Sequence, residues 1–341
     1  MMVKRLTILL VLMNNICIKA NELMKNAVKR LTIIKEDTMK KLYGVTTAMT
    51  TPMHKDESVN LEELEKLTNF LIERGVDCLY PLGTTGEMFK LSVEERKEVA
   101  ERVITSAAGR VTVFIHVGAM TLKDTLVLAK HAYESGADGI GVVTPSFFSA
   151  NEEELEFFYT TVAQAIPEDF PMYLYSIPQL SGNELPVSVV EKLADKHKNI
   201  IGIKYSYPDF LMLQEYQQVR NGNFSVLTGT DALFIPAMAM GCDGVISGVS
   251  GVYPEPFVEV LAALKNNDLE RAKEIQKDAL KLIHLLKAGA NMSYFKKALE
   301  TRGIQAGSVR APQIDIDEKT ESLLHEELKH WKENVSFEWE N

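Results

Sequence analysis

The chain has few cysteines, no excess of positive charge and no long apolar segment. Only three of its 341 residues are cysteines, Cys17, Cys78 and Cys242, and none forms a CxxC pair. This scarcity argues against a disulfide framework or a cysteine-based zinc site and favours a reducing compartment, so we expect a cytoplasmic protein. Lysine and arginine number 37 against 47 aspartates and glutamates, a net charge of −10. That balance disfavours nucleic acid or an anionic membrane as the main partner.

No segment approaches the roughly 20 consecutive apolar residues of a membrane-spanning helix. An apolar run from Leu6 to Met13 follows a basic start, as in a signal peptide. The run is short, however, and no clear small-residue cleavage site follows it. We therefore expect residues 1–40 to be a leader that is disordered or not part of the fold, with a secretion signal as the alternative.

From residue 41 onwards, short apolar segments alternate with longer amphipathic ones. Eight segments are nearly continuous in valine, isoleucine, leucine and aromatic residues, as in strands covered on both faces; examples are VTVFIHVGA and IIGIKYS. The amphipathic stretches between them begin at N-capping residues such as Asn60 and Ser92 and end at glycines such as Gly75. This alternation predicts an α/β fold, a (β/α)8 TIM barrel over residues 41–265, with a C-terminal helical extension over 266–341.

An open doubly wound sheet is the structural alternative. That fold would carry a glycine-rich dinucleotide-binding fingerprint after its first strand, and the segment TTAMTTPMH at that place is not one. The barrel is therefore the favoured prediction.

A lysine closes one of the apolar segments, at the strand end where a barrel of this type carries its catalytic groups. Lys204 follows Ile200–Ile203 directly. Withdrawal from water disfavours the charged form of an amine, and a neutral amine can attack a ketone to form a Schiff base. The alternative is a lysine that reaches solvent or pairs with an acid. Hydroxyl groups at neighbouring strand ends favour the Schiff base.

These hydroxyl groups follow the second and fifth predicted strands. Thr84 and Thr85 lie in a Gly-Thr-Thr-Gly turn, whose hydroxyl and N–H groups suit a carboxylate, although capping threonines in a tight turn have the same pattern. Tyr175 precedes a proline-bounded turn and can pass protons to an imine, or simply fill the barrel. Asp231 and Ser247 follow the seventh and eighth predicted strands.

The seven histidines do not have the spacing of a ligand cluster, which argues against a metal-dependent reaction. His116 ends the third predicted strand. We expect it to be a hydrogen-bonded core residue rather than a ligand.

Together these motifs resemble the dihydrodipicolinate synthase / N-acetylneuraminate lyase family of class I pyruvate aldolases. The match extends from about Tyr43 to beyond Gly251 and more weakly through the C-terminal helices. Its motifs follow in order and spacing: GTTGE, VTP, YSIPQLSG and GIK. The resemblance implies a Schiff-base lysine at Lys204, a proton-relay tyrosine at Tyr175 and binding of the pyruvate carboxylate at Thr84 and Thr85, with Thr85 also counted among the catalytic residues.

The resemblance also implies further substrate-binding positions and a quaternary structure. The carbonyl of Ile246 would face the imine, Ser206 would lie near the substrate's C4 hydroxyl, Asp231 would bind the sugar tail, and Ser247 is placed beside them. The family needs no metal or organic cofactor, and its members are usually homotetramers.

Three positions depart from family patterns. Leu180 stands where synthases of the lysine pathway carry an arginine for the aldehyde's carboxylate. Phe147 or Phe148 replaces a tyrosine that reaches a neighbouring subunit's site, and Ala232 replaces a glutamate of the neuraminate lyases.

We therefore expect a Schiff-base aldolase or lyase that cleaves, or forms, a 2-keto acid to give pyruvate and an aldehyde, similar to N-acetylneuraminate lyase or a 2-keto-3-deoxy sugar acid aldolase. The alternatives are 4-hydroxy-tetrahydrodipicolinate synthase, which condenses pyruvate with aspartate semialdehyde, and a non-catalytic barrel that binds keto acids.

Overall fold

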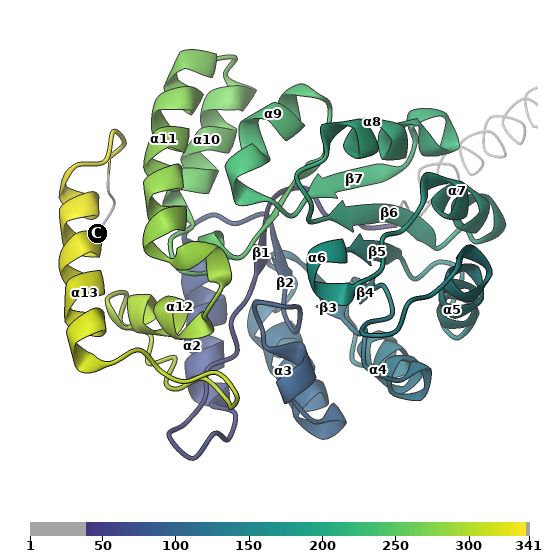
Figure 1. Cartoon of the computed structure of the whole chain (residues 1–341), viewed down its shortest axis with the longest axis horizontal. Coiled ribbons are helices and arrows are strands. Elements are labelled where there is room, and N and C mark those ends of the chain that lie inside the picture. The colour runs from purple at the N-terminus through teal and green to yellow at the C-terminus, as the bar shows by residue number, and fades with distance from the viewer. Residues whose placement is uncertain (1–38, 339–341) are drawn as a thin grey trace, which may run out of the picture. The chain divides into compact units, whose positions relative to one another are not determined.

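The computed structural model of the protein describes residues 39–338, so Cys17 and the predicted leader, apart from its last two residues, lie outside the described part (Figure 1). Eight parallel strands form a closed barrel in chain order, each paired with its sequence neighbours and β8 paired with β1. The strands are β1 Gly44–Ala48, β2 Cys78–Tyr80, β3 Thr112–His116, β4 Gly139–Val143, β5 Met172–Ser176, β6 Ile200–Tyr205, β7 Ser225–Thr228 and β8 Gly244–Ser247. The predicted (β/α)8 barrel is confirmed.

The helices alternate with the strands and surround the barrel (Figure 1). They are α2 Leu61–Glu73, α3 Val93–Ala107, α4 Leu122–Glu134, α5 Glu152–Gln164, α6 Pro178–Ser181, α7 Val187–Lys196, α8 Phe210–Gln218, α9 Phe234–Ala239 and α10 Glu255–Lys265. The extra helices are α11 Leu269–Leu285, α12 Met292–Glu300 and α13 Glu318–Glu333. No helix in residues 39–338 is long and apolar enough to cross a membrane.

Local sequence signals fix the beginnings of several helices. Asn60, Ser92, Thr121 and Asn151 each accept a hydrogen bond from a backbone N–H of the first turn, and Ser92 forms a reciprocal capping box with Glu95. Such caps satisfy N–H groups that have no partner inside the helix. The last helix, α13, begins at Glu318, because the side chain of Asp317 caps it by accepting the N–H of Thr320.

The barrel interior is filled by large aromatic side chains that lie beside glycines. A Cβ atom on Gly141 would clash with the Tyr80 hydroxyl, and one on Gly202 would clash with the Tyr173 ring. Both tyrosines are fully buried. The glycines in these strands therefore provide the space that lets the aromatic rings fill the centre of the barrel.

The C-terminal helices pack on one side of the barrel (Figure 1). The indole N–H of Trp331 on α13 donates to the carbonyl of Asp278 on α11 at 2.9 Å, and the Trp331 ring packs edge-on against Tyr253. Cys78 and Cys242 are free and buried, as expected of small apolar side chains.

Candidate active site

Strand alternation and register place Lys204 inside the barrel. Along β6, Gly202 packs against the Tyr173 ring inside the barrel, so Lys204, two residues later, points to the same face. In the register of β5 and β6, Tyr175 is the direct partner of Lys204. The strand continues one residue beyond Lys204, to Tyr205, so the lysine is its second-last residue rather than its end.

The amine of Lys204 lies among aromatic rings. Its Nζ atom is 4.1 Å from the ring centroid of Tyr175 and 5.2 Å from that of Tyr80, and only 4% of the residue is exposed. No carboxylate within residues 39–338 lies within 4.0 Å of this amine. The rings attract an ammonium group by about 0.5–2 kcal/mol, which holds the amine in place without an acid as its partner.

Tyr175 connects the lysine to the Gly-Thr-Thr-Gly turn. Its phenol oxygen is 3.2 Å from the hydroxyl oxygen of Thr84, and either group can donate. Tyr175 is 1% exposed, so its phenol meets the protein and the cavity rather than bulk water. The Tyr175 ring thus lies against the amine of Lys204, and its hydroxyl lies against that of Thr84.

The turn that carries Thr84 and Thr85 is held by backbone hydrogen bonds. The N–H groups of Gly86 and Met88 donate to the carbonyl of Gly83, and that of Glu87 donates to the carbonyl of Thr84. The hydroxyl of Thr51 donates to the carbonyl of Gly86 at 2.8 Å. Both threonines are half-buried at the cavity surface, where their hydroxyls can bind a ligand.

A cavity of about 290 Å³ opens above these residues. Seven of the eight predicted site residues line it: Thr84, Thr85, Tyr175, Lys204, Ser206, Asp231 and Ile246. Lys204 is the only lysine among the lining residues, which include no arginine, histidine or glutamate. Within the part of the chain that the structure describes, the cavity lining therefore offers one cation and one carboxyl group.

That carboxyl group belongs to Asp231. Asp231 as a residue is half-buried, but its Oδ1 atom is withdrawn from solvent and has no hydrogen-bond partner within residues 39–338. Its Oδ2 atom accepts a long hydrogen bond from the N–H of Val249 at 3.4 Å. Burial raises the pKa of Asp231 to about 6, against the opposing effects of the Ser247 hydroxyl, the Val249 amide and the charge of Lys204.

The prediction that Ser247 binds substrate is not supported, because Ser247 does not line the cavity. In β8 the side chain of Ile246 faces the cavity, so that of the next residue points to the opposite face. The Ser247 hydroxyl instead accepts the N–H of Ser250 at 2.8 Å and lies beside the Asp231 carboxyl. The predicted role of the Ile246 carbonyl stays a prediction.

His116 is a hydrogen-bonded core residue, as predicted. It is fully buried, and burial, together with the positive charges of Arg96 and Lys204, lowers its pKa well below the usual value. Its Nε2 atom accepts the N–H of Val143 at 3.3 Å, so Nδ1 carries the proton and donates to the carbonyl of Leu82 at 2.9 Å. Both ring nitrogens are thereby occupied by the backbone.

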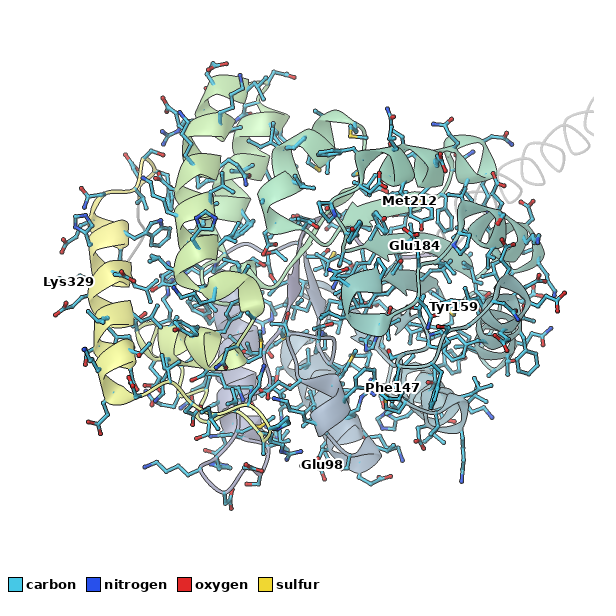
Figure 2. All side chains as sticks on the ribbon, in the orientation of Figure 1. Glu98, Phe147, Tyr159, Glu184, Met212 and Lys329 are labelled. Atoms are coloured by element: carbon cyan, nitrogen blue, oxygen red, sulfur yellow. The ribbon has the colours of Figure 1, made fainter. Side chains whose placement is uncertain are left out.

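The two phenylalanines that replace the expected tyrosine lie outside the cavity. Phe147 is 81% exposed with a positive φ of 76°, and Phe148 is 77% exposed. Their rings meet edge to face, with centroids 5.1 Å apart. Figure 2 labels Phe147 on the loop between β4 and α5, at the periphery of the barrel.

The comparisons with known proteins agree with this geometry. The profile of the Dihydrodipicolinate synthetase family matches residues 41–331. The chain belongs to the dihydrodipicolinate synthetase family. It is 34% identical over 287 residues to the 4-hydroxy-tetrahydrodipicolinate synthase of Methanopyrus kandleri, an alignment that covers 84% of this chain and 95% of that protein.

Two solved structures illustrate the range of this family. A prophage protein of E. coli K12 that belongs to the dihydrodipicolinic acid synthase family, in complex with pyruvate, matches with a TM-score of 0.80 and 30% identity, covering 86% of this chain and 99% of that one. A catalytic lysine mutant of the Ruminococcus gnavus sialic acid aldolase matches with a TM-score of 0.82 and 26% identity, covering 86% and 98%. Family membership confirms the predicted enzyme class, a class I pyruvate-dependent lyase.

Several cavity residues of this family member were not predicted from the sequence. Gln179 lies on the wall, where its amide donates to the carbonyl of Ser206 at 2.7 Å. The C-terminal helices supply an apolar wall made of Ile283, Met292 and Phe295. Gln179 lies inside the YSIPQLSG motif, so the sequence could have indicated it as a site residue. No sequence motif indicates the residues of the apolar wall, because they are far from the barrel motifs in sequence.

Proposed function

We propose that the protein cleaves a 2-keto acid to pyruvate and an uncharged aldehyde through a Schiff base on Lys204. The observation that carries the proposal is that Tyr175 contacts both the Lys204 amine and the Thr84 hydroxyl in a cavity whose lining within residues 39–338 includes no second cation. A keto acid whose only carboxylate is the one next to its ketone fits this distribution of charge.

The reaction uses each of these residues in turn. Lys204, in its neutral form, attacks the ketone, and loss of water gives a protonated imine. Tyr175 donates its proton to the hydroxyl group that leaves as water, and the resulting phenolate then accepts the proton of the C4 hydroxyl. The imine takes up the electron pair of the breaking C3–C4 bond, the aldehyde leaves, and pyruvate remains as an enamine that is protonated and hydrolysed. Thr84 and Thr85 hold the carboxylate, so that the breaking bond lies across the imine plane.

The part of the substrate that becomes the aldehyde would contact both polar and apolar side chains of the cavity. Ser206 and Asp231 line the cavity and bring a hydroxyl and a carboxyl group to it. Both side chains can hydrogen-bond to hydroxyl groups of a substrate. This supports a hydroxylated aldehyde, as from N-acetylneuraminate or a 2-keto-3-deoxy sugar acid.

A second candidate is condensation of pyruvate with aspartate semialdehyde. It is favoured by the name of the Methanopyrus kandleri relative, a 4-hydroxy-tetrahydrodipicolinate synthase. The aldehyde of that reaction carries a carboxylate, and Leu180 lines the cavity where the resemblance places an arginine for it. A second carboxylate would enter a cavity whose lining within residues 39–338 offers no cation besides Lys204, which disfavours this reaction.

A substrate panel tests the choice. The purified full chain is incubated with N-acetylneuraminate and with 2-keto-3-deoxy sugar acids, and the release of pyruvate is measured. Condensation of pyruvate with aspartate semialdehyde is measured beside it, with Lys204→Arg as the control for every reaction. We expect cleavage to be faster than condensation and to be absent from the variant. Faster condensation would support the synthase, and no turnover with any substrate would support a barrel that only binds keto acids.

We also propose that the protein is a homotetramer, as predicted from the resemblance. The molar mass of the protein in solution tests this.

A further inference from the structure

A second buried lysine lies behind the Gly-Thr-Thr-Gly turn, and the proposed reaction does not use it. Lys296 on α12 is completely buried, and its Nζ atom lies 2.8 Å from the Oε1 atom of Glu87, whose side chain is 1% exposed. The same amine donates to the carbonyl of Ser308 at 2.6 Å. The other carboxylate oxygen of Glu87 faces Lys90 at 2.9 Å. Glu87 therefore has one lysine on each oxygen, and only that of Lys296 is withdrawn from water.

Glu87 belongs to the turn that carries the two threonines. Its N–H donates to the carbonyl of Thr84 at 3.1 Å. Its backbone is left-handed, with φ 59° and ψ 36°, a conformation that few residues other than glycine adopt. A side chain held at its far end by a buried ion pair helps to keep this backbone in place, because the turn cannot relax without moving the carboxylate away from Lys296.

Lys296 belongs to the helix that forms the apolar wall of the cavity. Phe295 precedes it directly, Met292 lies one turn earlier, and both line the cavity. A Cβ atom placed on Gly248 would lie 2.9 Å from the Thr85 hydroxyl oxygen and 3.5 Å from the Phe295 ring. The hydroxyl and the ring thus approach the same point, from the turn and from α12.

We propose that Glu87 and Lys296 form a positioning pair, which fixes the hydroxyls of Thr84 and Thr85 relative to α12 and so sets the affinity for the carboxylate of the keto acid. The inference rests on the proposed function of the cavity. A buried ion pair is in general weak grounds for a stability role, since desolvation of both charges offsets their attraction. The role that we assign to the pair is to fix positions, because it joins the turn of Thr84 and Thr85 to helix α12, which lies more than 200 residues later in the sequence.

The test is a titration of imine formation. The full chain is mixed with increasing pyruvate and borohydride, and the fraction carrying a reduced pyruvyl group is read by mass. Glu87→Gln and the double variant Glu87→Gln/Lys296→Met remove the pair, and the double variant leaves neither partner of the pair as an unpaired charge. Lys296→Arg keeps the charge. Glu255→Gln is the matched control, because Glu255 pairs with Arg302 with side-chain exposures of 10% and 7%, and neither residue lines the cavity.

We expect the half-saturating pyruvate concentration to rise about tenfold or more in Glu87→Gln and in the double variant, to rise less in Lys296→Arg, and to stay unchanged in Glu255→Gln. Values within twofold of the wild type in both Glu87→Gln and the double variant would overturn the proposal, whatever the loss of thermal stability. Failure of the wild-type chain to trap pyruvate is a different result, because it would refute the proposed function itself.

Discussion

Replacement of Asp231 by asparagine should stabilise the protein, by an amount that grows with pH. Burial raises the pKa of this carboxyl to about 6 in the folded chain, against a usual value near 3.8. The folded state therefore holds the proton more tightly than the unfolded state. Ionisation of Asp231 therefore lowers the free energy of unfolding. This loss is absent below pH 3.8, grows between pH 3.8 and 6, and is complete above pH 6. The difference of about two pKa units corresponds to roughly 3 kcal/mol at pH 7.5, and to about 1 kcal/mol at pH 4.5.

The assay is urea unfolding of the wild type and of Asp231→Asn at pH 4.5, 6 and 7.5. We expect the free energy of unfolding of the variant to exceed that of the wild type by about 1 kcal/mol at pH 4.5 and by about 3 kcal/mol at pH 7.5. Asp169→Asn, at an exposed position, controls for the loss of one negative charge. A difference for Asp231→Asn that is the same at all three pH values would refute the reasoning, since it would mean that this carboxyl does not change its proton affinity on folding.

Three further predictions concern single side chains. Tyr175→Phe keeps the ring beside Lys204 and removes the phenol, so kcat should fall by about 10²- to 10⁴-fold while trapping of pyruvate persists; an unchanged kcat would exclude a proton-carrying role. Ser247→Ala should destabilise the fold by about 1–3 kcal/mol in thermal or urea unfolding, because the N–H of Ser250 loses its acceptor, with no change in half-saturating pyruvate; weaker pyruvate binding would place Ser247 in the site after all. Leu180→Arg should raise the rate of condensation with aspartate semialdehyde relative to cleavage, and an unchanged ratio of the two rates would show that charge at this position does not select the aldehyde.

The barrel was predictable because its pattern repeats. Each strand is a short apolar run and each helix carries its own start and stop residues, so local chemistry and the fold agree at every unit. The proximity of Tyr175 and Lys204 was predictable for a related reason: the carboxyl ends of parallel strands meet at one end of the barrel, which brings such residues together whatever their separation in sequence.

The remaining features depend on side-chain direction and on long-range packing. Ile246 and Ser247 are adjacent, and strand alternation allows only one of them to face the cavity, but the sequence does not say which of the two does so. The wall made by Met292 and Phe295 and the contact of Lys296 with Glu87 arise where the chain returns to the barrel after its last strand. No local pattern encodes such a contact.

The most direct test of the central claim is to locate the reduced pyruvyl group. After incubation with pyruvate and borohydride, the chain is digested with a protease and the masses of its lysine-containing peptides are measured by mass spectrometry. We predict one added group, on Lys204 and not on the buried Lys296, and none in Lys204→Arg. A group on another lysine, or an unmodified wild-type chain at saturating pyruvate, would contradict the assignment of Lys204 as the nucleophile.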